Sequence, residues 1–417
     1  MSSVLIGRCF LTTPILRERE GSSDHRNSRP VNVPIGGDVF AVEGESHLLT
    51  IAPPVAGRVR GCIIPNLLTY PGSVVVVDLT GEAYSVTSRA RREMGQTVVR
   101  LDPFRVIDQE SDALNPLDLL AGLDGLALES ACQDVAALLQ GVRSNTDVWE
   151  RAAFGLLSGV IGYVASVPEK NKFADLYSTF HSDDTVYNLA VVLDTIGKKI
   201  PKMSYSEIAS WLQRVDAERS RVLNSVTTHL KPLMTQLSQK ALGTSTFSLT
   251  DFVQEEPFSI YIMIPPAKFP VHGSLLRVWI GTLLHSLMRR RAPQALPTLF
   301  LLDECAKLGH FPQLDAAIQS GSGSGFRIWT YWHELQQLRS LYPASWLVSN
   351  CNAVQAFGVR DYSATAELAA LLGVEAEEIR SLANDEQIVS LGGVPSRLKQ
   401  LDYLTDPMFA GRFDTRG

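Results

Sequence analysis

Residues that could bind phosphate lie in a loop between two segments of regular pattern. The loop Ala52–Val59 reads APPVAGRV, follows an apolar run, Leu49–Ile51, and leads into Gly61–Leu68, which can begin a helix. A second apolar run, Ser73–Val77, follows and ends on Asp78. Strand, loop, helix and strand in this order form the scaffold of a P-loop, whose backbone N–H groups cradle phosphate. The pattern therefore predicts the scaffold of a phosphate-binding site.

The same loop departs from a working P-loop at most of the positions that contact phosphate or metal. Ala52 stands where a working loop has its first glycine, whereas Gly57 keeps the second. Arg58 replaces the lysine that bridges the phosphates, and its planar fork does not substitute freely for a compact ammonium group. Val59 replaces the hydroxyl that would bind Mg²⁺, and the two prolines after Ala52 stiffen the loop. The order of strand, loop and helix is thus kept, whereas the side chains that would contact phosphate and Mg²⁺ are replaced.

Two acidic residues follow a second apolar run much further along the chain. Asp303 and Glu304 come directly after Leu299–Leu302, which is the pattern of a Walker B strand. In an active enzyme the aspartate would hold Mg²⁺ through water and the glutamate would polarise the attacking water. Taken alone, the segment could equally be a buried strand that ends in two solvated acids. The P-loop scaffold upstream favours the nucleotide site.

The composition is that of an ordinary globular chain and argues against several classes of function. The 417 residues are 45% hydrophobic and 20% charged, and the net charge of −6 gives no overall basic field for nucleic acid. The five cysteines are scattered without CxxC spacing, which argues against a disulfide framework or zinc site and favours a reducing compartment. No apolar segment approaches the roughly 18 residues that span a bilayer.

Four segments of different pattern position these residues. We expect a polar, partly mobile leader over residues 1–46 and the first part of a nucleotide-binding domain, built of βαβ units, over residues 47–112. Apolar residues at three- and four-residue spacing predict an all-helical insertion of about four to six helices over residues 113–240. Strand signals return in residues 241–417, which we assign to the second part of the nucleotide-binding domain. The alternation predicts an α/β fold with a mainly parallel sheet covered by helices on both faces.

A series of short motifs occurs along the chain in a fixed order. The motifs are IIPNLLTYPGSVVVVDLTGEAY at residues 63–84, LDPF at 101–104, NPLD at 115–118, ERSRVLNSVTTHL at 218–230, IYIMIPP at 260–266, LFLLDECAKLGHFPQLDAAI at 299–318, QQLRSLYPASW at 336–346 and NAVQAFGVRDYSATAELAALLG at 352–373. Together they resemble the type IV secretion coupling proteins, the TraG-like conjugative DNA-transfer ATPases. The resemblance implies a RecA-like P-loop NTPase fold with an all-alpha insertion, ATP and Mg²⁺ as cofactors, and nucleotide sites between the subunits of a hexamer.

Most positions that are catalytic in this family are changed in the chain. The family's Asp-Pro-Lys-Gly-Glu becomes Asp78–Glu82, which reads DLTGE and loses a further lysine. Ser322 stands where an arginine finger would reach the neighbouring nucleotide, and His333 stands where a glutamine would sense the γ-phosphate. Asp303 and Glu304 survive as catalytic acids, and Asp303 would hold Mg²⁺ if a metal binds at all. An arginine finger alone is worth about 10³ to 10⁵ in rate, so the resemblance predicts hydrolysis near background.

Two functions follow, and both stay open at this point. In the first, the chain is a coupling-protein-like component that recruits or delivers a DNA or protein substrate, with ATP hydrolysis impaired or absent, as in a pseudo-ATPase. In the second, it is an active, ATP-driven hexameric translocase of DNA or protein that uses Arg58 in place of the P-loop lysine. The altered loop argues against ATP and Mg²⁺ binding and favours the first function, but it does not decide whether the chain is an enzyme.

The resemblance also implies partners and a location. The expected partners are components of the type IV secretion channel, together with a relaxase, single-stranded DNA or effector proteins as cargo. We expect either a homo-hexamer or an association with an active homologue. Members of the family are usually anchored by N-terminal transmembrane helices, and we expect that the leader over residues 1–46 does not hold such an anchor. We therefore expect a cytoplasmic chain that reaches the inner membrane, if at all, through its partners.

Overall fold

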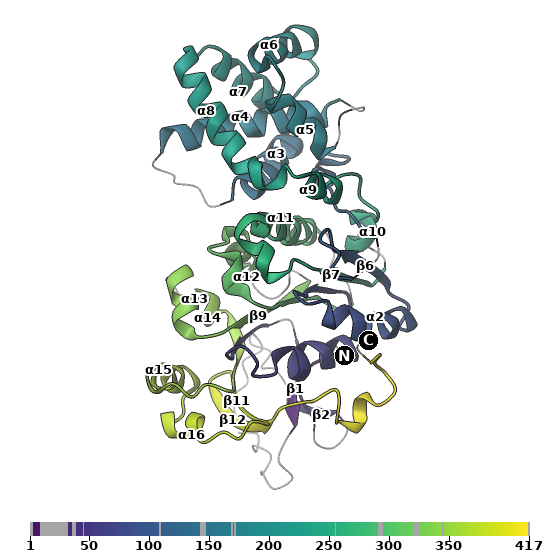
Figure 1. The fold of residues 1–417 in the computed structure, drawn as a ribbon, viewed down its shortest axis with the longest axis vertical. Coiled ribbons are helices and arrows are strands. Elements are labelled where there is room, and N and C mark those ends of the chain that lie inside the picture. Colours follow the sequence, from purple (N-terminus) through teal and green to yellow (C-terminus); the bar gives the residue numbers. More distant parts are fainter. Residues whose placement is uncertain are drawn as a thin grey trace, which may run out of the picture.

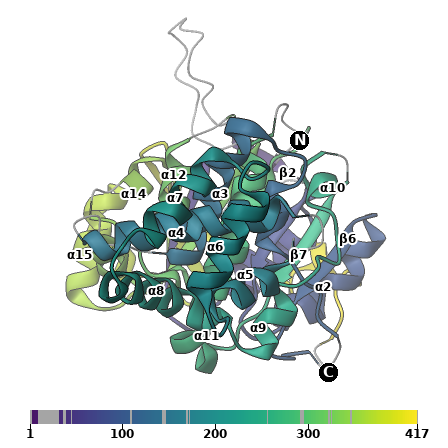
Figure 2. The ribbon, with the colours of Figure 1, turned by 90° about the horizontal axis from the view of Figure 1, so that it is seen from above.

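The molecule has a helical part at one end and a part that carries a large sheet at the other (Figure 1). Seen from the helical end, the helices lie over the sheet-bearing part (Figure 2). The computed structural model describes residues 3–8, 32–35, 39–44, 46–107, 110–141, 147–167, 170, 172–254, 256–290, 295–320, 323, 325–343 and 346–415 of the chain.

A twelve-stranded sheet organises the sheet-bearing part, in the order β2-β3-β1-β12-β11-β10-β4-β9-β8-β5-β7-β6. Its seven strands from β10 to β6 run parallel to one another, as the sequence predicts for most of the sheet. These strands are β4 (His47–Ile51), β5 (Val74–Val77), β6 (Thr97–Leu101), β7 (Phe258–Ile262), β8 (Thr298–Leu302), β9 (Phe326–Trp332) and β10 (Cys351–Ala356).

The other five strands are antiparallel, and some of them lie where the sequence pattern indicated no element. These strands are β1 (Val4–Arg8), β2 (Asn32–Ile35), β3 (Val39–Val42), β11 (Glu386–Leu391) and β12 (Val394–Lys399). β1 pairs with β12, so Arg8 lies opposite Lys399. The side-chain amide of Asn66 also holds β1, because it accepts a hydrogen bond from the Leu5 N–H and donates one to the Leu5 carbonyl, both at 2.8 Å. β1 is therefore held by residues that lie far away in the sequence, and the order of residues within the strand itself does not reveal such partners.

Helices cover both faces of the sheet, as expected. β5 consists of four buried valines; Val74 and Val76 face one core, and Val75 and Val77 face the other. The first core is closed by α1 (Ile64–Leu67) and α2 (Glu82–Glu93), and the second by α11 (Phe269–Met288) and its neighbours. Strands that are buried on both faces need continuous runs of apolar residues. This explains the sequences of β5, VVVV, and of β8, TLFLL.

The helical part contains more helices than the spacing of apolar residues predicted. Seven α-helices, rather than four to six, lie between residues 125 and 241 in the described part of this segment. They are α3 (Gly125–Gln140), α4 (Val148–Ala165), α5 (Phe173–Phe180), α6 (Thr185–Ile196), α7 (Lys202–Leu212), α8 (Asp216–Leu230) and α9 (Gln236–Ala241). Several of these helices are short. Each then contains too few apolar residues at three- and four-residue spacing for the sequence alone to show where one helix ends and the next begins.

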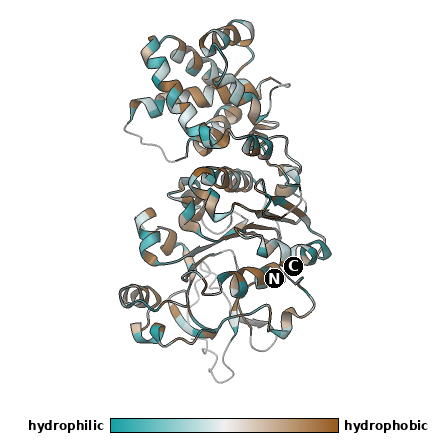
Figure 3. Ribbon diagram, in the orientation of Figure 1, coloured by the Kyte–Doolittle hydropathy of each residue, from teal (hydrophilic) through white to brown (hydrophobic). Residues whose placement is uncertain are grey.

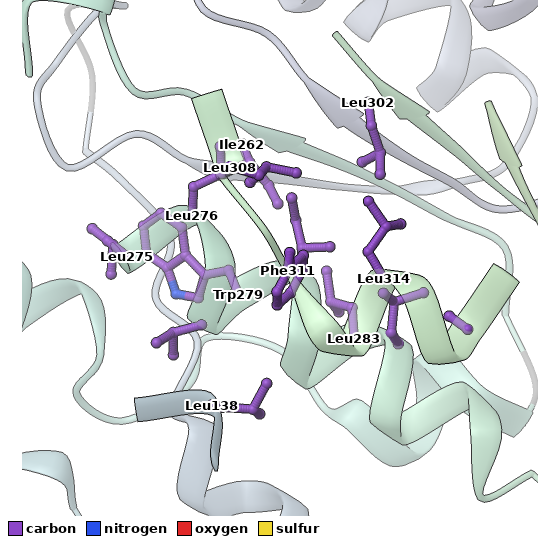
Figure 4. Close-up of a cluster of buried hydrophobic side chains, with 14 of the residues drawn as sticks. Leu138, Ile262, Leu275, Leu276, Trp279, Leu283, Leu302, Leu308, Phe311 and Leu314 are labelled. Atoms are coloured by element: carbon purple, nitrogen blue, oxygen red, sulfur yellow. The ribbon is translucent and has the colours of Figure 1, made fainter. Parts of the chain in front are cut away.

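The second core joins the helical part to the sheet through α11. Side chains of α11 meet the strands on one side and α3 on the other (Figure 4). The labelled members are Leu138, Ile262, Leu275, Leu276, Trp279, Leu283, Leu302, Leu308, Phe311 and Leu314. Gly281 allows this approach, because a Cβ at that position would lie 2.1 Å from the Leu138 side chain. Figure 3 shows the apolar residues concentrated in these inner strands and helices.

Six further α-helices complete the set described in the structure. They are α10 (Leu249–Gln254), α12 (Pro312–Gln319), α13 (Leu335–Leu341), α14 (Trp346–Ser349), α15 (Tyr362–Leu372) and α16 (Ala376–Arg380). No helix in the described ranges is both long enough and apolar enough to cross a lipid bilayer.

Candidate functional site

Four of the residues singled out in the sequence meet at one edge of the sheet. Arg58 lies in the loop after β4, Asp303 and Glu304 follow β8, and His333 follows β9. β9 lies between β4 and β8, and all three strands are parallel. Their carboxyl ends therefore share one edge, which is where open α/β sheets place their ligand sites.

The loop after β4 has a left-handed backbone conformation at two positions. Gly57 has a φ of +96°, and Val55 has a φ of +61° although it carries a β-branched side chain. A non-glycine residue in this region costs about 1–3 kcal/mol, so the surrounding structure must impose the conformation of Val55. The Ala52 N–H donates to the Trp332 carbonyl at 2.8 Å, and Val59 begins the π-helical turn Val59–Ile63. The loop therefore runs from the end of β4 directly into a helical turn, in the order that the sequence predicts.

The side chain of Arg58 turns into the protein instead of toward the open side of the loop. It is only 7% exposed. Its Nε lies 3.3 Å from Oδ1 of Asp303, and its Nη2 donates a hydrogen bond to Oε1 of Glu304. Its Nη1 donates to the carbonyl of Ala52 at 3.3 Å. The guanidinium is therefore held at the ends of β4 and β8 by groups of the same chain.

His333 completes this cluster from the end of β9. Its Nε2 hydrogen-bonds to Oε1 of Glu304 and lies 3.4 Å from Nη2 of Arg58. The His333 backbone N–H donates to Oε1 of Gln337 at 3.3 Å, which fixes the start of α13 beside it. We call Arg58, Asp303, Glu304 and His333 the Arg58 cluster.

Burial and hydrogen bonding act differently on the two acids. Burial raises the pKa of Asp303, and the single contact with Arg58 only partly opposes it. Burial also works to raise the pKa of Glu304, but the hydrogen bonds from His333 and Arg58 outweigh it and hold that pKa below its ordinary value. Glu304 also has a φ of +52°, so its backbone is strained at the point where its carboxylate meets Arg58. The cluster is built around an ionised Glu304.

The residues present do not fit Mg²⁺ in the way the family resemblance implies. Mg²⁺ takes near-octahedral oxygen coordination, and Val59 lacks the hydroxyl that would supply one ligand. The carboxylates of Asp303 and Glu304 already face the Arg58 guanidinium. Within the described ranges, no group of three or more His, Cys, Asp or Glu side chains is placed to hold a metal ion. Ser322, at the predicted finger position, lies outside the described residues.

A pocket on the outer side of the loop was not predicted. Its volume is about 350 Å³. It is lined by Pro53, Pro54, Val55, Ala56, Gly358, Val359, Arg360, Ile379, Arg380, Leu382, Ala383 and Asn384. The Arg360 guanidinium donates to Oδ1 of Asn384 at 2.7 Å. The contributing segments are more than 300 residues apart in sequence, and no local motif connects them.

Comparison with known proteins decides the family. The family described as Type IV secretory system Conjugative DNA transfer has a sequence model that matches residues 13–390. The chain belongs to this family. Its sequence is 26% identical over 342 residues to Protein VirD4 of Rhizobium radiobacter, covering 79% of this chain and 47% of that protein. It is 24% identical over 364 residues to the conjugal transfer protein TraG of Escherichia coli, covering 79% and 55%. This conjugative DNA-transfer family member thus spans about half the length of the relatives it matches.

Solved structures agree with the fold. The coupling protein TrwB, solved in complex with ADP and Mg²⁺, aligns with a TM-score of 0.67 at 15% identity and covers 85% of each chain. VirB4 of Thermoanaerobacter pseudethanolicus aligns with a TM-score of 0.54 at 14% identity, covering 93% of this chain and 98% of VirB4. The predicted α/β, RecA-like P-loop NTPase fold of this family member is confirmed.

Proposed function

We propose that this chain recruits or delivers a DNA or protein substrate in a type IV secretion or conjugative DNA-transfer system, and that it hydrolyses little or no ATP. Membership of the conjugative DNA-transfer family supports the first half of the proposal. The inward position of Arg58 is the observation that carries the second half.

The Arg58 cluster opposes hydrolysis in two ways. A P-loop cation must reach the β- and γ-phosphates, but Arg58 would first have to leave Asp303 and Glu304. Breaking a buried ion pair by removing one partner costs about 3–5 kcal/mol, because it leaves an uncompensated charge. Glu304 also accepts hydrogen bonds from both Arg58 and His333, so its carboxylate is engaged where it would have to polarise water.

The proposed partners are those of the family. They are components of the type IV secretion channel, with a relaxase, single-stranded DNA or an effector protein as cargo. TrwB has been solved with ADP and Mg²⁺, so this nucleotide is the first ligand to test at the loop after β4. A chain without hydrolysis could act as a homo-hexamer or within an assembly that contains an active homologue.

Assembly gives one test of the proposal. Ser322 replaces the residue that would link one subunit to its neighbour's nucleotide, so ATP should not tighten the association between copies. Sedimentation velocity with and without ATP should give the same distribution of species. Hexamers that form only when ATP is added would contradict this part of the proposal.

Phosphate release tests the loss of hydrolysis. We expect the unmodified chain and the Glu304→Gln variant to release phosphate at the same background rate, because Glu304 has no catalytic role to lose. The variant controls for contaminating ATPases, which would not respond to it. Turnover that Glu304→Gln abolishes would instead establish the active translocase that uses Arg58 in place of lysine.

A further inference from the structure

The strand β1 is held by two side-chain amides from distant segments of the chain. Asn66 in α1 accepts a hydrogen bond from the Leu5 N–H and donates one to the Leu5 carbonyl, both at 2.8 Å. Nε2 of Gln387 in β11 donates to the Ile6 carbonyl at 2.8 Å. Gly7 makes room for the second amide, because a Cβ at that position would overlap the side-chain nitrogen of Gln387. Two neighbouring residues of β1 thus each bind a different buried amide.

Both amides also lead to Cys62. Nδ2 of Asn66 donates a second hydrogen bond to the Cys62 carbonyl, at 2.8 Å. The side-chain amide of Gln355 in β10 donates to Oε1 of Gln387, and Oε1 of Gln355 accepts from Sγ of Cys62 at 3.7 Å. Asn66, Gln355 and Gln387 are at most 1% exposed. Two buried hydrogen-bond routes therefore run from β1 to the carbonyl and the thiol of Cys62.

Cys62 belongs to a helical turn of uncommon form. Residues Val59–Ile63 make a π-helical turn, in which the Ile64 N–H bonds to the Val59 carbonyl five residues earlier. Such turns are rare, and the ordinary alternative is α-helical hydrogen bonding, with one residue fewer in the turn. Arg58 lies directly before the turn. Contacts outside the turn must favour the π form, and both routes from β1 end within it.

We propose that β1 is a strap that holds the turn Val59–Ile63 in its π form and thereby keeps Arg58 in the Arg58 cluster. Without β1, the amides of Asn66 and Gln387 lose their backbone partners, and partly satisfied buried networks are costly. Relaxation of the turn to α-helical bonding changes its length by one residue and moves Arg58 away from its partners. The inference rests on the proposed function, in which the inward position of Arg58 opposes nucleotide binding.

Two cysteines report on the strap within one molecule. Burial raises the pKa of Cys62 to about 12, and it raises the pKa of Cys132 in α3 to about 12 as well. Thiols of this kind react only after the surrounding structure opens, because the thiolate is the reactive form. Cys62 therefore reports on the turn after Arg58, and Cys132 reports on the helical part of the same chain.

The experiment is alkylation of the folded, full chain, with each cysteine quantified by mass spectrometry. Gly7→Ala places a methyl group against the Gln387 amide and displaces β1. The labelling rate of Cys62 should rise by about 5- to 150-fold, the usual range of coupling between two sites. The rate of Cys132 should not change. An unchanged rate at Cys62, or equal rises at both cysteines, would overturn the strap.

Gly159→Ala is the matched control, because it adds the same methyl group to a close contact elsewhere. A Cβ at Gly159 would lie 3.2 Å from the Ser204 carbonyl, in the helical part. This variant should raise the labelling rate of Cys132 and leave that of Cys62 unchanged. A rise at Cys62 as large as the one in Gly7→Ala would show that general destabilisation opens the turn, which would overturn the strap.

A second pair of variants keeps the test decisive if Gly7→Ala does not fold. Arg8→Met removes the ion pair between Nη2 of Arg8 and Oδ1 of Asp406, at 2.6 Å, and adds no atoms to the sheet. Arg89→Met removes a comparable pair with Asp414, at 2.7 Å, that does not involve β1. Arg8→Met should speed the labelling of Cys62, and Arg89→Met should not. The same rate in both variants would overturn the strap.

Nucleotide binding tests the link from the turn to Arg58. In calorimetry with ATP and Mg²⁺, Gly7→Ala should bind about 5- to 150-fold more tightly than the unmodified chain or Gly159→Ala. Apparent affinity rises with the fraction of molecules in the competent state, and release of β1 increases that fraction. Faster labelling of Cys62 with unchanged ATP affinity would overturn the proposal.

The proposed function and the strap can fail separately. Phosphate release that depends on Glu304 in the unmodified chain would overturn the proposed loss of hydrolysis, whatever the labelling rate of Cys62. Labelling of Cys62 that does not respond to Gly7→Ala or Arg8→Met would overturn the strap, even if the unmodified chain releases no phosphate.

Discussion

The Nε atom of Arg58 lies 3.3 Å from Oδ1 of Asp303, which ties the loop after β4 to the end of β8. In a working P-loop enzyme a lysine and an aspartate at these positions act on phosphate and metal bound between them. Here the two side chains contact each other directly. The buried carboxylates at this sheet edge thus have their counter-ion in the same chain, and this pairing has consequences for stability as well as for the proposed loss of hydrolysis.

The first prediction concerns the stability that Arg58 provides. Arg58→Ala should lower the free energy of unfolding by about 3 kcal/mol, because it leaves Asp303 and Glu304 buried without their counter-ion. Urea denaturation measures the change. Arg60→Ala is the control on the same helix and should cost less than about 1 kcal/mol, since its pair with Asp402 is partly exposed. Equal effects at the two positions would show that the Arg58 cluster is not stabilising.

The second prediction concerns rescue of catalysis. Arg58→Lys combined with Val59→Thr gives the loop the lysine and the hydroxyl of a working P-loop, yet it should not give full turnover. His333 still binds Glu304, and Ser322 still occupies the predicted finger position. Steady-state phosphate release measures the outcome. Full turnover after these two substitutions would show that the downstream changes do not matter.

Sequence pattern was sufficient for the parts of the site that depend on local order. The buried valines of β5 and the apolar residues of β8 give continuous runs that only a doubly covered strand needs, so the loop and the two acids could be placed. The P-loop and Walker B patterns also assign Arg58 and Asp303 to one nucleotide site. Whether hydrolysis is lost remains a prediction.

The remaining features depend on contacts that local pattern does not encode. The inward turn of Arg58 is decided by side chains that lie about 245 to 275 residues away, as the contacts with Glu304 and His333 show. β1 likewise gains its place from Lys399 and from the Asn66 amide. The pocket beside Val55 joins the loop to residues after β10 and around α16. None of these pairings leaves a periodic signal.

The third prediction concerns pH. Burial and the nearby Arg327 lower the pKa of His47 from 6.5 to about 4, and the Ile328 N–H donates to its Nδ1 at 3.1 Å. Between pH 6.5 and pH 4 the unfolded chain therefore binds a proton that the folded chain does not. The stability that neutral His47 contributes is present above pH 6.5 and is lost as the pH falls toward 4.

The measurement is the free energy of unfolding across this pH range. Acidification should lower it by up to about 1.4 kcal/mol per pH unit through His47. His47→Asn keeps an acceptor for the Ile328 N–H but removes the titration, so its pH slope should be smaller. His181→Asn, at an exposed position, is the matched control. A slope that His47→Asn leaves unchanged would contradict the assignment.

The fourth prediction concerns the contact between α4 and α7. A Cβ at Gly159 would lie 3.0 Å from the Glu207 Cβ and 3.2 Å from the Ser204 carbonyl, so the helices would have to separate. The atoms nearest to a Cβ at Gly155 would be those of the Glu207 carboxylate, which can move away. Gly159→Ala should therefore destabilise the helical part by about 1–3 kcal/mol. Gly155→Ala should be neutral or gain up to about 1 kcal/mol from helix propensity.

Thermal unfolding followed by circular dichroism compares the two glycine variants directly. Both substitutions add one methyl group to the same helix, so any difference reports the packing against α7. If Gly155→Ala lowered the melting temperature as much as Gly159→Ala, close helix approach would not explain the glycines of α4.

Calorimetry with ATP and Mg²⁺, with phosphate release followed in the same sample, decides whether this sheet edge works as a nucleotide site. We expect no turnover and weak or absent binding of ATP with Mg²⁺, because Arg58 is held by Asp303 and Glu304. Tight binding together with turnover that depends on Glu304 would contradict this expectation, and would mean that Arg58 leaves the cluster to serve as the P-loop cation.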